Sequence, residues 1–404
     1  MSKIADGAAP GRKLPPAIVA LGFTSFFADV GSEMIFPLLP IFLVSLGAAP
    51  TFLGLVEGLA EATSSLLKLA SGYVADRFSQ RKSLVIFGYG IAALARPLVA
   101  IASAPWQVLG IRLTDRVGKG IRSTPRDVLI ATSAAKGEAG RAFGFHRSMD
   151  HAGAVLGPIV ATALLALGVP LRTVFALALI PGVLSVLAVT TVREPDAPPK
   201  ALDAAPDEPA KKHLPARLRS YLLIVALFAL GNSSDAFLLL RARDLGVSVV
   251  SIPLLWTTFH VAKLGSSYLG GSWSDRMPRT KLIVSGWVVY AVTYLAFGFA
   301  TEAWHAWALF VVYGTYYGLT EPAEKALVKD LAPERVRGRA YGTYNFIVGV
   351  MAVPAGLFMG WLWQTWSSRI ALAAGAGIAA ASSVMLLVWA RRGTSEEGAA
   401  GASR

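Results

Sequence analysis

The sequence predicts an all-α integral membrane protein, with twelve transmembrane helices arranged as two six-helix pseudo-repeats around a central cavity. Three observations carry this prediction. Hydrophobic residues make up 54% of the 404 residues and charged residues only 16%, which is too little charge for soluble domains of this total length. Apolar runs of about 20 residues, long enough to cross a bilayer, recur along almost the whole chain. Short motifs also recur once in each half.

Twelve apolar segments follow one another along the chain, and each is expected to cross the membrane once. They cover residues 16–46, 51–74, 83–103, 106–132, 143–167, 171–192, 218–241, 249–272, 281–300, 304–331, 341–364 and 369–390. The first segment is longer than a signal-peptide core and no small-residue cleavage site follows it, so we expect it to be retained.

These segments divide the chain into four parts. Residues 1–192 are expected to form an N-terminal six-helix bundle, and residues 218–390 a C-terminal six-helix bundle. Between them, residues 193–217 are rich in Pro, Ala, Asp and Lys and form a polar linker. Residues 391–404 form a polar C-terminal tail.

Basic residues set the expected orientation. Lys and Arg gather in alternate loops and in the central linker, while the other loops nearly lack them. By the positive-inside rule, the linker and both termini lie in the cytoplasm, and the protein lies in the plasma (inner) membrane as a multi-pass protein. The net charge of +13 is therefore explained by the basic loops that orient the protein in the membrane. We expect the lipid bilayer as a partner, and no nucleic acid. The absence of cysteine excludes disulfides and cysteine-ligated zinc.

The two halves carry matching motifs. GYVADRFSQRK at 72–82 matches GSWSDRMPRTK at 271–281, which places Asp76 and Asp275 199 residues apart. GRAFG at 140–144 matches GRAYG at 338–342 with an offset of 198. Parallel repeats of this kind imply two bundles around an axis normal to the membrane, with a cavity between them.

Over its whole length the chain resembles transporters of the major facilitator superfamily. The most specific element is the loop after helix 2, where the family pattern is G-x-x-x-D-R-x-x-R-[RK]. It is matched by Gly72, Asp76, Arg77, Arg81 and Lys82, with Ser79 in place of the usual second glycine. The resemblance implies that this loop, together with Asp275 and Arg276 in the second half, gates alternating access.

A further family motif, G-x8-G-x3-G-P in helix 5, is associated with antiporters. It is matched by Gly144, Gly153, Gly157 and Pro158. The glycine pair that usually follows is absent, so the resemblance implies antiport only in part.

The least typical segment is IRLTDRVGKGIRSTPRD at 111–127, which resembles a bacterial branch of the superfamily. It lies in a membrane span, yet it carries seven charged residues. At about 100° per residue, Arg112, Arg116, Lys119 and Arg126 share one helix face. A charge in the bilayer core costs at least about 2.5–3.5 kcal/mol, so this stripe must face water or countercharges. We expect Arg112, Arg116 and Lys119 to bind the solute; the alternative for Arg122 and Arg126 is that they snorkel to the cytoplasmic surface.

Carboxylates in the first two helices are the expected proton-coupling residues. Asp29 and Glu33 lie one turn apart in helix 1, and Glu61 lies in helix 2. The resemblance implies that helices 1, 4, 7 and 10 line the cavity, so that Asp29 and Glu33 face Arg112 and Arg116. Two interpretations stay open: these carboxylates exchange partners with the solute during proton coupling, or they form structural ion pairs that hold helix 1 to helix 4.

Two other groups of polar residues complete the expected cavity. In helix 5, His146, Asp150 and His151 lie within two turns; we expect hydrogen bonding or proton relay there and no metal site. In helix 7, the run GNSSD is polar enough to line a cavity, and Asn232 and Asp235 are expected to contact the solute.

Together these features predict a secondary active transporter that moves a small organic solute by alternating access, as proton-coupled export of an amphipathic or anionic compound. One alternative is a cation or metal-chelate permease that uses the carboxylates of helices 1 and 2. Another is a transporter-like sensor or assembly factor that does not turn over. We expect a monomer without a cofactor. We do not expect an enzyme, because the sequence contains no nucleophile–base spacing, phosphate loop or metal signature.

Overall fold

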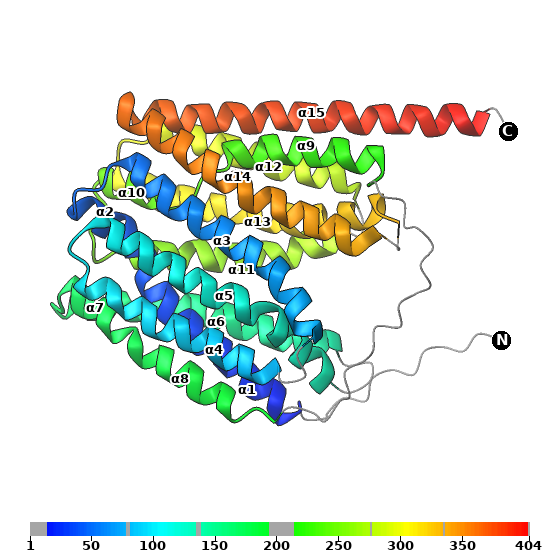
Figure 1. The fold of residues 1–404 in the computed structure, drawn as a ribbon. Helices are drawn as coiled ribbons and strands as arrows, with labels where there is room; N and C mark the ends of the chain where they lie inside the picture. The colour runs from blue at the N-terminus through cyan, green and yellow to red at the C-terminus, as the bar shows by residue number, and fades with distance from the viewer. Residues whose placement is uncertain are drawn as a thin grey trace.

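The computed structural model is a bundle of long helices that run side by side (Figure 1). The structure describes residues 14–77, 81–134, 139–193, 214–274, 277–333 and 336–402, and this part of the chain contains no strand. The all-α prediction is confirmed. Eight of the helical spans in these residues are long and apolar enough to cross a membrane.

The elements fall into the two expected sets of six spans. The first half contains α1 (Pro16–Ile35), η1 (Phe36–Leu38), α2 (Leu39–Ser45), α3 (Pro50–Arg77), α4 (Arg81–Ala95), η2 (Arg96–Ile101), α5 (Pro105–Ser133), α6 (Ala139–Ala166), α7 (Leu171–Leu177) and α8 (Leu179–Thr190). The second half contains α9 (Ala216–Gly231), α10 (Ala236–Asp244), α11 (Ile252–Ser274), α12 (Arg279–Phe299), α13 (Ala303–Leu331), α14 (Arg337–Thr365) and α15 (Ser368–Ala402).

Several spans are broken, and proline accounts for two of the breaks. Pro37 lies in η1 between α1 and α2, and Pro97 lies in η2 directly after α4. Proline has no backbone N–H and clashes with the preceding turn, so the regular α-helix ends there. The break between α9 and α10, at residues 232–235, contains no proline and coincides with the polar run GNSSD.

The last helix extends beyond the predicted span. The apolar segment ends near residue 390, whereas α15 continues to Ala402.

The outer surface of the bundle is apolar. Leu94, Ile101, Trp106 and Leu167 are each more than 65% exposed. In water, such side chains would form large apolar patches, which soluble monomers rarely expose. The surface suits contact with lipid acyl chains.

The two ends of the bundle differ. We call the end at which α1 begins and α15 ends the inner end, and the end at which α2 ends and α3 begins the outer end (Figure 1). Between the halves, α3 packs against α14, α6 against α11, and α2 against α10. Since α2, α10 and the first turns of α3 belong to the outer end, the halves are closed there.

Glycines make this closure possible. A Cβ atom at Gly54 would lie 1.9 Å from the carbonyl oxygen of Gly356, and one at Gly58 would lie 2.7 Å from that of Ala352. At Gly360, a Cβ would lie 2.5 Å from the carbonyl oxygen of Pro50. The backbones of α3 and α14 therefore touch over the outer part of both helices, a contact that only glycine permits.

We predict that Gly54→Leu opens the outer end, because the added side chain has no room against α14. Thr51 Oγ1 and Gln364 Oε1 lie 2.7 Å apart across this contact. In the naturally cysteine-free chain, a Thr51→Cys/Gln364→Cys pair should react with a short thiol-specific cross-linker. We expect Gly54→Leu to reduce the yield about fivefold or more. Gly110→Leu is the matched control, since no atom lies within 4 Å of a Cβ there; equal yields in the two variants would contradict the prediction.

Candidate functional site

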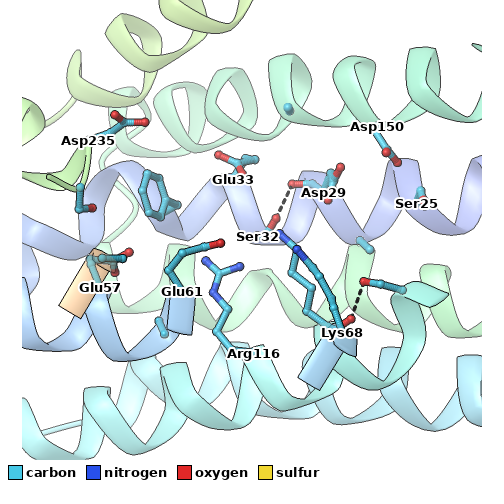
Figure 2. Close-up of a pocket in the computed structure, with 18 of the residues that line it drawn as sticks. Ser25, Asp29, Ser32, Glu33, Glu57, Glu61, Lys68, Arg116, Asp150 and Asp235 are labelled. Atoms are coloured by element: carbon cyan, nitrogen blue, oxygen red, sulfur yellow. Dashed lines mark hydrogen bonds between the residues drawn. The ribbon is translucent and has the colours of Figure 1, made fainter. Parts of the chain in front are cut away.

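A cavity of about 940 Å³ lies between the two halves. Side chains of α1, α3, α5 and α6 line it from the first half, and residues of the α9–α10 break, α11, α13 and α14 line it from the second. Along α5 the lining runs from Arg112 to Asp127, and along α1 from Phe36 back to Ser25. The cavity thus extends from mid-bundle toward the inner end (Figure 2).

Two glycines place the charged helix α5 tightly between its neighbours. A Cβ at Gly118 would lie 2.6 Å from the carbonyl oxygen of Gly88 in α4. A Cβ at Gly120 would lie 2.3 Å from Cβ of Leu67 in α3. The sequence GKG therefore lets α3 and α4 approach α5 closely, and the basic stripe between these contacts faces the cavity.

Arg112 is buried and paired. Its Nη2 donates to both carboxylate oxygens of Glu57, each at 2.9 Å, and its Nη1 lies 4.0 Å from Asp115 Oδ2. Its guanidinium also lies over the ring of Phe36, 5.6 Å from the ring centroid. Arg112 therefore ties α5 to α3, and its partner is Glu57 rather than Asp29 or Glu33. The structural interpretation paired Arg112 with Asp29 or Glu33 of helix 1, whereas the observed ion pair is with Glu57 of α3.

A second buried pair lies beside it. Arg96 Nε donates to Asp115 Oδ1 at 2.8 Å, and Arg96 Nη1 donates to the carbonyl oxygen of Ala28 at 2.6 Å. Arg122 is also buried, with its guanidinium 4.2 Å from the ring centroid of Tyr89. These contacts join α1, α4, η2 and α5 into one block.

Arg116 and Lys119 behave differently. Both line the cavity, and in the described part of the chain neither side chain forms a hydrogen bond or an ion pair; Arg116 Nε is buried without a partner. Asp29 and Glu61 line the same cavity, and their carboxylates also have no such contact within the described residues. Figure 2 shows Glu61 and Arg116 pointing into the same space, below Asp29 on α1. The structure thus brings together two cations and two carboxylates that are not directly paired.

Glu33 instead reaches the second half. Its Oε2 accepts a hydrogen bond from Trp256 Nε1 at 2.8 Å and lies 3.7 Å from His260 Nε2. Both partners lie on α11. Sequence reasoning placed Glu33 opposite α5 and missed this contact, because no local signal shows which helix of the other half approaches α1.

The facing wall is built around the α9–α10 break. Asp235 accepts hydrogen bonds from the hydroxyl groups of Tyr313, at 2.6 Å, and Tyr317, at 3.2 Å. Asn232 Nδ2 donates to the hydroxyl oxygen of Tyr316 at 3.0 Å. The α9–α10 break thus holds both predicted residues on the cavity wall, against aromatic side chains of α13.

The polar residues of α6 lie near the inner end. His146 Nε2 lies 2.7 Å from Ser25 Oγ, and His146 Nδ1 lies 3.6 Å from Asp150 Oδ2. Arg147 Nη2 lies 3.7 Å from Glu321 Oε1 of the second half. Among the described residues, no group of three or more His, Cys, Asp or Glu side chains is placed to hold a metal ion.

The antiporter-like motif packs α6 against α1. A Cβ at Gly153 would lie 2.4 Å from the carbonyl oxygen of Phe26, and one at Gly157 would lie 2.5 Å from that of Val30. Pro158 is buried within α6, whereas a Cβ at Gly144 would meet open space. The motif therefore brings α6 close to the helix that carries Asp29 and Glu33.

The predicted gating residues are only partly described. Gly72, Asp76 and Arg77 lie in the last turns of α3, and their side chains fall outside the described part. Arg81 is the first residue of α4. Asp275 and Arg276 lie outside the described residues.

Two bundles of six spans around a polar cavity define a multi-pass membrane transport protein. The chain belongs to the Major Facilitator Superfamily, whose family model matches residues 21–240 and 221–403. It is 32% identical over 383 residues to an uncharacterized MFS-type transporter of Methanocaldococcus jannaschii, covering 93% of this chain and 95% of the relative. It is 24% identical over 368 residues to Multidrug resistance protein MdtH of Yersinia pestis, covering 85% of this chain and 86% of that relative.

Solved structures show the same fold. A bacterial homolog of the human lysosomal transporter Spinster, in an inward-facing and unoccupied conformation, aligns with a TM-score of 0.71 and 17% identity, covering 94% of this chain and 96% of that chain. The nucleoside transporter NupG aligns with a TM-score of 0.78 and 12% identity, covering 92% of this chain and 99% of that chain. The resemblance to the superfamily and the predicted fold are confirmed.

We predict that Glu57→Gln destabilises the protein, because it leaves the buried Arg112 guanidinium without its countercharge. Breaking a buried ion pair costs about 3–5 kcal/mol, and the melting temperature in detergent should fall by several degrees. The matched control is Asp127→Asn, since the Asp127 side chain is 50% exposed and exposed pairs contribute about 0–1 kcal/mol. Equal melting temperatures for the two variants would contradict a structural role. In the double variant with Arg112→Met, part of the lost stability should return.

Proposed function

We propose that this protein is a secondary active transporter that exports a small anionic or amphipathic organic solute through the central cavity, coupled to protons. The observation that carries the proposal is the pair of cavity-lining cations, Arg116 and Lys119, which have no direct partner among the described residues. A charge in a low-dielectric setting without a partner is costly. An anionic group of the solute would supply the missing charge.

Asp29 and Glu61 are the proposed proton sites beside these cations. When both carboxylates are ionised, they compensate Arg116 and Lys119 across the cavity. When they bind protons, this compensation is lost and the cations are left to the solute. Proton binding and anion binding would thus affect each other through charge, which is the basis for coupling the two fluxes.

The second half would hold the remainder of the solute. Asn232 and Asp235 lie on the facing wall, and the aromatic rings of Trp256 and Tyr317 line the cavity beside them. Aromatic surface suits the apolar part of an amphipathic compound. A solute held by both halves would favour movement of the halves as units during alternating access.

Gating is proposed for the inner end. Asp76, Arg77 and Arg81 lie where α3 ends and α4 begins, with Gly72 one turn before, and Asp275 and Arg276 occupy the equivalent place in the sequence of the second half. Their charges could pair across the two halves when the inner end closes. The outer end, which is closed here, is held by the glycine contacts of α3 and α14.

Three observations support the direction and setting. The chain is similar to a protein named for multidrug resistance, and the antiporter-like glycines pack α6 against the carboxylate-bearing helix α1. The basic loops favour an orientation in the inner membrane with both termini on the cytoplasmic side. The site lies within one chain, which is consistent with a monomer.

A second candidate is a permease for a cation or metal chelate. The carboxylates of Asp29 and Glu61, which have no direct partner in the described part of the chain, favour it, since they could bind a cationic group directly. In that case Arg116 and Lys119 would serve only as countercharges.

A ligand screen by thermal unfolding separates the candidates. A ligand at 100 times its Kd stabilises the folded state by about 2.7 kcal/mol. We expect organic anions to raise the melting temperature of detergent-purified wild type by several degrees, and to lose most of this effect in Arg116→Gln and in Lys119→Gln. Lys325→Gln is the matched control, because Lys325 also lines the cavity but is paired with Glu321 at 2.8 Å. Stabilisation by cations, unaffected by the Arg116 and Lys119 variants, would support the permease instead.

A further inference from the structure

We propose that Glu33 of α1 and His260 of α11 form one proton-binding site shared by the two halves, and that its hydrogen bonds hold the outer end closed. This inference rests on the proposed proton coupling and gives it a second residue, His260, that lies in the other half of the protein.

The geometry leaves one hydrogen bond to be completed. Glu33 Oε2 accepts from Trp256 Nε1 at 2.8 Å, whereas His260 Nε2 lies 3.7 Å from the same oxygen. His260 Nε2 is buried and has no hydrogen-bond partner among the residues that the structure describes. Hydrogen bonds between nitrogen and oxygen have lengths of about 2.7–3.2 Å. A movement of about half an ångström would therefore join the imidazole to the carboxylate.

The protonation state decides the strength of that bond. A neutral imidazole donates from Nε2 only in the tautomer that carries its one proton there, and otherwise presents a lone pair that the carboxylate oxygen repels. When His260 takes up a proton from cavity water, Nε2–H donates to the Glu33 carboxylate, and the bond is charge-assisted and about twice as strong as a neutral one. When the site opens, the proton returns from His260 to water. No other reactant is needed.

Aromatic packing keeps the imidazole in place. The rings of Trp256 and His260 meet edge to face with their centroids 5.0 Å apart. The ring centroid of Phe259 lies 5.3 Å from that of His260. Trp256 also packs against Phe36 of the first half at 5.2 Å. The ring of His260 therefore cannot turn freely away from Glu33. Its protonation then changes the strength of a contact between the two halves.

The contact belongs to the closed outer end. One residue beyond Trp256, Thr257 Oγ1 lies 3.5 Å from the carbonyl oxygen of Val155 in α6. If the halves part at the outer end, α11 separates from α1 and α6, and Glu33 loses both donors. Glu33 and His260 also line the cavity, which extends from them toward the inner end.

Other charged groups act on the pair from every side of the cavity. They are Asp29 on α1, Arg116 and Lys119 on α5, His151 on α6, Asp235 in the α9–α10 break, and Lys263 on α11. The cations of α5 favour an ionised Glu33. An anionic solute bound to them would reduce this effect, so that solute binding weakens the contact that closes the outer end.

The test measures the outer end directly, without any solute. Because the chain has no cysteine, Ala49→Cys and Val250→Cys place spin labels on the outer loops of the two halves. Distances between the labels are measured in lipid nanodiscs from about pH 8 to about pH 5, where imidazole titrates. We expect the ratio of closed to open molecules to rise at least about threefold toward low pH, and this rise to disappear in His260→Gln and in Glu33→Gln.

Two further variants keep the result interpretable. Trp256→Phe removes the fixed hydrogen bond but no titrating group, so it should lower the closed population at every pH and keep the threefold rise. His151→Gln removes another cavity histidine and should keep the wild-type response. The proposal is overturned if the wild type shows no rise, if His260→Gln retains it, or if His151→Gln abolishes it. Because no transport is measured, these outcomes stand apart from success or failure of the ligand screen.

Discussion

A charged side chain inside a membrane span must meet a partner or water, and the first half of this protein is arranged around that constraint. Arg112 with Glu57 and Arg96 with Asp115 are buried pairs that join α3, η2 and α5. Each pair compensates one cation within the block itself. Arg116, on the same stripe, has no such partner among the described residues and faces the cavity. The same constraint thus explains both the rigid part of the bundle and its open, polar centre.

The two halves contribute different chemistry to the cavity. The first half supplies most of the charge, on α1, α3 and α5. The second half supplies a broken helix and aromatic walls, in which the Asp235 carboxylate is held by tyrosine hydroxyls. Glycines at the outer end allow the halves to close tightly, and Glu33 crosses that boundary to Trp256. A proton or solute that changes the charge of the first half can therefore act on the contact between the halves.

Much of the fold could be predicted from the sequence, because apolar run length and basic loops directly report the physics of the bilayer. The predicted span 106–132 is α5 within one residue at each end. The partners of the charges could not be predicted in the same way. Arg112 meets Glu57 because Gly118 and Gly120 bring α5 against its neighbours, and such packing is set by tertiary structure. Glu33 and His260 belong to different halves and lie more than 200 residues apart in the sequence, so their spacing gives no sign that they meet.

The most direct test of the account is the number of protons exchanged when a solute binds. Using the organic anion that most raises the melting temperature, binding heats are measured near neutral pH in buffers of different ionisation enthalpy, for wild type and Lys119→Gln. If solute and proton binding are coupled through the charges of one cavity, wild type should take up about one proton per bound anion, and Lys119→Gln should bind weakly with less proton uptake. Tight binding with no proton exchange in any buffer would contradict the account.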